Sequence, residues 1–117
     1  MFTPFVMTIA CPGALAANFE YHFTVLAPFT VEQLSMKCSN AGSLRVKLGT
    51  NSDDDEFLTY TNVGSSLVEV GDAITDWRYD AKPHYVAGDV FEFTVDFDGA
   101  GGTAGEDFTA TFTCTPG

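Results

Sequence analysis

Four consecutive acidic residues form the densest group of side chains in this sequence that could bind a metal ion. They are Asp53, Asp54, Asp55 and Glu56, and carboxylate oxygens are the ligands that calcium prefers. The run lacks the glycine at position six and the bidentate glutamate at position twelve of an EF-hand loop. The pattern therefore favours a solvated loop tip, with calcium binding as the alternative, and we predict no cofactor.

Hydrolytic chemistry has weaker support. His22 and Ser35 could form a triad with an outward aspartate, but the sequence has no nucleophile elbow, HExxH motif or phosphate-binding glycine loop. Cys11, Cys38 and Cys114 are odd in number and lie at no metal or disulfide spacing. We therefore expect three thiols, with Cys38 and Cys114 buried because they continue apolar alternations, and we predict that the protein is not an enzyme.

A group of aromatic residues is the best candidate for a binding site. Trp77, Tyr79 and Tyr85 lie in one irregular segment among charged neighbours. Such a platform can anchor a protein interface or stack against a sugar ring. The alternative is that these side chains pack onto the end of the fold.

Charge excludes one class of partner and is unevenly distributed. The 117 residues carry 5 Lys and Arg against 16 Asp and Glu, which gives a net charge of -11 and argues against nucleic acid as a partner. Residues 1–52 sum to +1, from two acids and three bases, and residues 53–117 sum to -12, from 14 acids and two bases. The nearly neutral first part is the expected contact surface, and the acidic part is the expected solvated surface. No apolar run is long enough to predict a membrane span.

Apolar and polar residues alternate with a period of two in short segments separated by turn residues, which predicts β-strands. The clearest segments are residues 19–25, 34–38, 44–48, 91–97 and 108–114. Residues 2–10, 57–63 and 67–70 are further candidates, and Pro28 marks a corner, bulge or edge position. In the 91–97 segment the alternation places Asp96 and Asp98 on the outward face. We predict an all-β, antiparallel two-sheet sandwich, jelly-roll-like, with about eight strands.

The N-terminal residues allow two interpretations. Residues 1–18 form either an arm or the first strand, and residues 19–117 form the sandwich domain. Phe2, Phe5 and Met7 are apolar and are candidate interface residues, because an apolar arm can add a strand to a neighbouring protein. The first basic residue is Lys37, so the segment lacks the positive start of a signal peptide.

The order of these features resembles the small jelly-roll domains of tailed-bacteriophage virion proteins. The resemblance covers roughly residues 20–115 and depends on the corner Leu26-Ala27-Pro28-Phe29 and on the turn Ala87-Gly88-Asp89-Val90 before a late strand. Such domains occur as capsid decoration (cement) proteins and as modules of head or tail fibres. This sequence has no shaft repeat and no tail-attachment segment, which favours a decoration subunit.

The resemblance implies a function without catalytic residues. We expect a cement protein that binds the outer capsid surface and stabilises the shell by bridging copies of the major capsid protein. It would be a homo-oligomer, with a trimer favoured, located on the virion and assembled in the host cytoplasm. The alternative is a receptor-binding or carbohydrate-binding module of a head or tail fibre.

Overall fold

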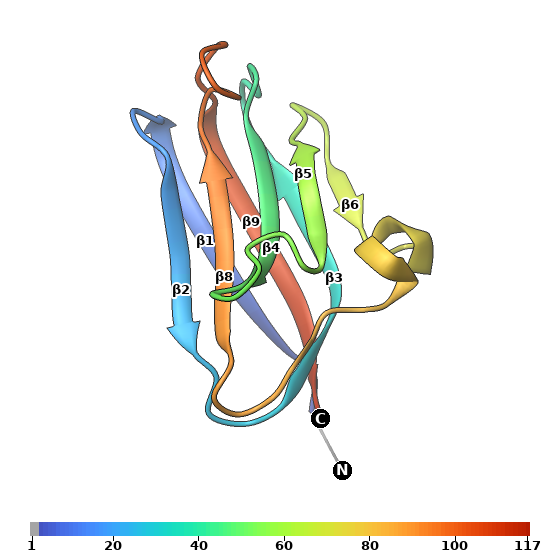
Figure 1. Cartoon of the computed structure of the whole chain (residues 1–117). Coiled ribbons are helices and arrows are strands. Elements are labelled where there is room, and N and C mark those ends of the chain that lie inside the picture. The colour runs from blue at the N-terminus through green and yellow to red at the C-terminus, as the bar shows by residue number, and fades with distance from the viewer. Residues whose placement is uncertain (1–2) are drawn as a thin grey trace.

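The alternating segments of the sequence form nine strands in the computed structural model, which describes residues 3–117 (Figure 1). The strands are β1 (Phe5–Ala14), β2 (Phe19–Thr24), β3 (Phe29–Lys37), β4 (Arg45–Thr50), β5 (Leu58–Asn62), β6 (Val68–Val70), β7 (His84–Tyr85), β8 (Val90–Asp96) and β9 (Glu106–Pro116). Two short 3-10 turns, η1 (Ile74–Asp76) and η2 (Arg78–Asp80), occupy the segment that lacked a clear period. No helix in this part of the chain is long and apolar enough to cross a membrane.

The strands form two antiparallel sheets that pack face to face. Sheet A has the order β1-β9-β3-β6, with β7 also paired to β3, and sheet B has the order β2-β8-β4-β5. Strands from the start of the chain pair with strands from its end, as in β1 with β9 and β2 with β8. This nested antiparallel pairing is the winding of a jelly roll, so the predicted fold class is confirmed.

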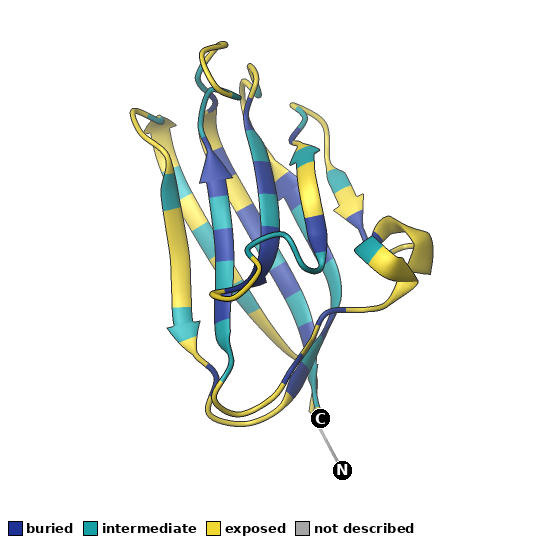
Figure 2. Cartoon of the chain, in the orientation of Figure 1, coloured by how far each residue is buried: buried dark blue, intermediate teal, exposed yellow. Residues whose placement is uncertain are grey.

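The core lies between the sheets and is rich in aromatic rings. β8 contributes Phe91 and Phe93, and β9 contributes Phe108 and Phe112, all with no exposed surface. Phe93 meets Phe112 edge to face at 5.0 Å between ring centroids, a geometry that aromatic rings prefer. Figure 2 shows the resulting alternation of buried and less buried positions along β8 and β9. The alternation that predicted these two strands therefore reflects their inward faces.

The corner predicted at Pro28 is the point where the chain changes sheets. β2 ends at Thr24 in sheet B, and β3 begins at Phe29 in sheet A. Residues 5–14 form β1, which is hydrogen-bonded to β9 along its length. The N-terminal segment is thus the first strand of sheet A rather than a separate arm.

The two long sides of the sandwich differ in how they are covered. On one side the edge strands are β5 and β6, and the segment between β6 and β7 folds against them (Figure 1). We call this the closed side. On the other side the edge strands are β1 and β2, and no further element within residues 3–117 covers the gap between them. We call this the open side.

Candidate functional site

The predicted aromatic platform does not form. Trp77 is 2% exposed and Tyr85 is fully buried, whereas Tyr79 is 74% exposed. Trp77 and Tyr85 both belong to the hydrophobic core, so their assignment to an exposed interface was wrong. The alternative interpretation, in which these aromatic side chains pack onto the fold, is correct for Trp77 and Tyr85. Of the three residues, Tyr79 alone remains available to a partner.

Local hydrogen bonds explain how this segment turns Trp77 inward. The carboxylate of Asp76 accepts hydrogen bonds from the backbone N–H groups of Gly71 and Ala73, at 3.0 and 3.2 Å. These bonds hold the pKa of Asp76 below its ordinary value. The Trp77 indole N–H has no hydrogen-bond partner among the described residues. The Trp77 side chain therefore acts through its apolar surface, which fills the closed side of the core.

Tyr85 connects the two sheets through a buried hydrogen bond. Its hydroxyl donates to the carbonyl oxygen of Gly49 on β4 at 2.9 Å, and its ring stacks on Phe29 at 5.1 Å. Burial, together with nearby carboxylates such as Glu56, raises the pKa of Tyr85 far above its ordinary value. The phenol stays neutral and serves as a structural link, not as an acid or base.

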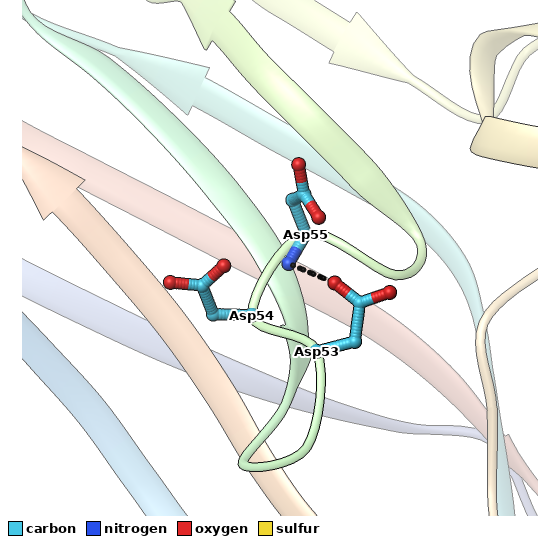
Figure 3. Close-up of side chains that lie close together, drawn as sticks. All are labelled: Asp53, Asp54 and Asp55. Atoms are coloured by element: carbon cyan, nitrogen blue, oxygen red, sulfur yellow. Dashed lines mark hydrogen bonds between the residues drawn. The ribbon is translucent and has the colours of Figure 1, made fainter.

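The acidic loop places three carboxylates together, and two of them pair with cations. One ligand atom from each of Asp53, Asp54 and Asp55 lies within 4.8 Å of the others, and Figure 3 shows the three side chains spreading outward from the loop. Asp54 pairs with Lys47 at 2.8 Å, and Asp55 pairs with Arg78 at 2.8 Å. The protein's own cations thus balance much of the charge that calcium would balance.

Hydrogen bonds within the loop show why these acids lie together. The Asp53 carboxylate accepts from the backbone N–H of Asp55 at 3.4 Å, drawn as a dashed line in Figure 3. Asp53 and the Arg78 guanidinium hold the pKa of Asp55 below its ordinary value. The loop therefore has a structural explanation as a turn tied to β4 and to the closed side.

Asp96 lies on the outward face of β8, as the alternation predicts, but it is not exposed beside Asp98. It is only 3% exposed, and its carboxylate receives the Arg45 Nε–H at 2.8 Å. The backbone N–H of Ala100 also donates to Asp96, at 3.3 Å. Burial opposes ionisation of Asp96, but the Arg45 guanidinium and the Ala100 N–H outweigh it and hold the pKa below its ordinary value. Asp96 thus fixes the loop that follows β8.

The outer face of sheet B carries charged side chains on β2, β4 and β8, and we call it the charged face. Tyr60 lies there between two cations, with the Arg45 guanidinium 4.0 Å and the Lys47 ammonium 4.7 Å from its ring centroid. A groove of about 580 Å³ runs past Tyr60 to Glu20 and His22 on β2. The sequence places Tyr60 in the candidate strand 57–63 but does not single it out, because the cations that flank its ring come from the neighbouring strand β4.

The outer face of sheet A is different, and we call it the threonine face. Register places Thr8 of β1, Thr111 of β9 and Ser35 of β3 side by side in one row. The hydroxyls of Thr8 and Thr111 are 3.3 Å apart. Neighbouring rows place Val6 beside Thr113 and Ala10 beside Thr109. The β1 and β9 part of this face therefore carries no charged side chain between Phe108 and Thr115.

The remaining interface candidates lie on the open side. Phe5 is 37% exposed and packs edge to face on Phe29 at 5.8 Å between ring centroids, while Met7 is partly buried against the core. Phe2 lies outside the described residues. An apolar hollow of about 260 Å³ beside β1 is lined by Phe5, Met7 and Phe23, with Leu26, 88% exposed, at its rim. The open side therefore presents an apolar surface that is available to a partner.

The polar residues considered for catalysis are far apart in the fold. His22 projects from β2 on the charged face, and Ser35 projects from β3 on the threonine face, so the two cannot share a triad. Cys38 and Cys114 are buried as predicted, and burial raises the pKa of each thiol to about 11. Neither is activated as a nucleophile, because the thiolate form is suppressed at neutral pH.

Comparison with protein-family models, curated proteins and solved structures finds no match to this chain. The function of this chain must therefore be inferred from its own surfaces. The chain offers an uncharged strip along β1 and β9, a charged face on sheet B and an apolar open side, and these are surfaces suited to binding.

Proposed function

We propose that this chain is a non-catalytic structural protein of a virion, which binds the outer surface of a protein shell and bridges its subunits. The resemblance to phage decoration proteins and the jelly-roll winding of the strands both support this proposal. The partner is the major capsid protein. The chain acts by covering surface, because a protein that binds the assembled lattice and not its free subunits stabilises the assembly by mass action.

One observation carries the proposal: the strip of the threonine face formed by β1 and by β9 from Phe108 onward is uncharged, and it lies on the side of the sandwich opposite the charged face. The threonine face next to β1 presents hydroxyl and methyl groups without charge. Such a surface loses little hydration energy when a protein covers it, whereas ionised groups resist dehydration. The charged face and the acidic loop remain in water and keep the decorated particle soluble. The threonine face is therefore the surface that contacts the shell.

Binding to shells tests this assignment directly. The purified chain is added to shells that lack it, and sedimentation measures the bound fraction while heating measures shell disruption. We expect the chain to bind and to raise the disruption temperature. Thr111→Lys places a charge in the centre of the threonine face and is expected to abolish binding. The matched control, His22→Lys on the charged face, should bind normally.

Two results would contradict the proposal. Shells that resist heat equally with and without the chain would exclude a cement role. Equal binding by the Thr111→Lys and wild-type chains would exclude the threonine face as the contact surface.

The groove around Tyr60 supports a second candidate function, carbohydrate binding by a receptor-binding module. A tyrosine ring beside carboxylates and cations is a combination that can stack and hydrogen-bond a sugar. If this candidate is correct, the protein binds members of a glycan array, and Tyr60→Ala abolishes that binding while Tyr79→Ala does not. An array on which the wild-type chain binds nothing would remove it.

A further inference from the structure

β1 is an exposed sheet edge that no charged side chain protects. It is ten residues long and, among the described strands, pairs only with β9, so its second edge has unpaired backbone N–H and C=O groups. Proteins usually protect such edges with charged side chains, because an uncharged edge pairs readily with another strand. No charged residue occurs from Thr3 to Phe19. β1 is thus suited to receive a further strand.

The sequence of β1 limits which strand fits. Pro4 and Pro12 have no backbone N–H to donate, so they bound the segment Phe5–Cys11 that can form a full set of hydrogen bonds. The two prolines are equally distant from Thr8. If two copies of β1 pair antiparallel with Thr8 opposite Thr8, Pro4 of each copy lies opposite Pro12 of the other. Every missing donor then falls at an end of the paired segment.

The same register also matches side chains. Residues whose numbers sum to 16 lie opposite each other, so Met7 faces Ile9, Val6 faces Ala10 and Phe5 faces Cys11. Each pair is uncharged, and two of the pairs place a large side chain against a small one. We propose that two copies of this chain pair through β1, antiparallel about a two-fold axis at Thr8, so that sheet A continues from one copy into the other.

Charge identifies the second copy as an acceptable partner at this edge. Each chain has a net charge of -11, so most contacts between two copies bring acidic surfaces together. β9, the neighbour of β1, has no charged residue from Phe108 to its end at Pro116. Pairing through β1 therefore keeps the acidic loop and the charged face of one copy away from those of the other.

The pairing also covers apolar surface that is open in one copy. The 260 Å³ hollow lined by Phe5, Met7 and Phe23 lies directly beside this edge. Tyr21 on β2 is a further exposed aromatic residue on the same side. A second copy at β1 brings its own open side next to these groups, which adds hydrophobic stabilisation to the backbone hydrogen bonds. The result is a dimer, whereas the family resemblance favoured a trimer.

Disulfide formation across the axis tests the register. Directly opposed residues of antiparallel strands have Cα atoms about 4.5 or 5.5 Å apart, and both distances suit a disulfide. In a Cys11→Ser background, we expect Thr8→Cys to form a covalent dimer under mild oxidation. Ala10→Cys is the matched control, because its two introduced thiols would lie about 13 Å apart along the strands. Combining Val6→Cys with Ala10→Cys should restore cross-linking.

Mass measurement tests the dimer without any cross-link. We expect light scattering to give twice the 12.6 kDa mass of one chain. Thr8→Lys should raise the dimer dissociation constant by about tenfold or more, since it places like charges opposite each other at the axis. The control is Thr111→Lys on the adjacent strand. This variant should remain a dimer but should no longer bind the shell. The Thr111→Lys chain therefore separates loss of shell binding from loss of the dimer.

Three results would overturn the pairing. The first is a wild-type chain with the mass of a monomer or a trimer at high concentration. The second is Thr8→Cys cross-linking no faster than Ala10→Cys. The third is a Thr8→Lys chain that stays dimeric with unchanged circular dichroism.

Discussion

The closed and open sides of the sandwich are both gaps between two edge strands, one from each sheet. A segment of the chain covers the closed side and none of the described residues covers the open side. On the closed side the chain supplies its own cover: Trp77 enters the core, and the backbone N–H of Arg78 donates to the carbonyl of Phe57 at 2.8 Å. On the open side Phe5 and Phe23 remain partly exposed. The difference teaches that the largest apolar side chain of the chain packs within the fold of a single copy, whereas the open side leaves apolar surface exposed.

The largest expected effect on the free energy of unfolding comes from a substitution on the closed side. Trp77→Ala should lower the free energy of unfolding by about 3–5 kcal/mol, because it removes a fully enclosed aromatic side chain and leaves a cavity. Urea denaturation measures the loss. Trp77→Phe should recover most of it, since the indole N–H makes no hydrogen bond among the described residues. A loss below about 1 kcal/mol for Trp77→Ala would mean that the closed side is not part of the core.

The next effect concerns the ion pair at the end of β8. Asp96→Asn should cost about 2 kcal/mol, because it removes the charged partner of Arg45 from a buried position. Chemical denaturation compares it with Asp98→Asn, whose carboxylate is more exposed and whose change should cost less than about 0.5 kcal/mol. Equal losses for the two variants would contradict the special role of Asp96.

Acid should weaken the same ion pair and leave the open side unaffected. The pKa of Asp96 is lower in the folded chain than its ordinary value, so the unfolded state binds the proton more tightly. Its stabilising contribution is therefore fully present above about pH 5 and is lost as the pH falls through the folded pKa. Urea midpoints measured from about pH 7 to pH 3 should fall less steeply for Asp96→Asn. If the urea midpoints of the wild-type and Asp96→Asn chains fell in parallel, the acid sensitivity would come from other carboxylates.

A smaller effect is expected on the open side. Phe5→Ala should cost only about 1 kcal/mol, because the ring already keeps about a third of its surface in water. This value must be measured in the Thr8→Lys chain, so that dimer dissociation does not contribute. A loss comparable with that of Trp77→Ala would show that the open side belongs to the core of a single chain.

The smallest effect separates two neighbouring aromatic residues. Tyr79→Ala should change the free energy of unfolding by less than about 0.5 kcal/mol, because the ring is exposed and its contact is with the Arg78 guanidinium at 4.8 Å. Thermal denaturation of the Tyr79→Ala and Trp77→Ala chains, measured under the same conditions, compares the two losses. A large loss for Tyr79→Ala would place this side chain in the core.

The sequence predicts the strands well where one face of a strand is buried along its whole length. β8 and β9 are central strands, so the alternation of Phe91 and Phe93 or of Phe108 and Phe112 records directly which face is inside. The two-sheet architecture follows from several such strands. Which strands pair is not visible in the alternation, because pairing joins residues such as Phe5 and Cys114 that are far apart in the chain.

The candidate surfaces are harder to predict, for two physical reasons. Trp77 lies between η1 and η2, where local bonds to Asp76 set the direction of the chain without any period. Asp96 follows the alternation of an outward residue, but Arg45 on the neighbouring strand covers it. The burial of Trp77 and that of Asp96 both depend on contacts that form only in the folded chain. The uncharged run from Thr3 to Phe19, in contrast, is visible in the sequence alone.

The position of β9 has a consequence for the order of folding. β9 lies between β1 and β3 in sheet A, yet it is the latest of the nine described strands in chain order. During synthesis β1 emerges first and remains without its neighbour until residues 106–116 are available. Contacts between such distant segments form slowly, and an unpaired apolar strand is prone to aggregate while it waits. Expression in cells should therefore be more sensitive to changes in β1 than the equilibrium stability of the folded chain.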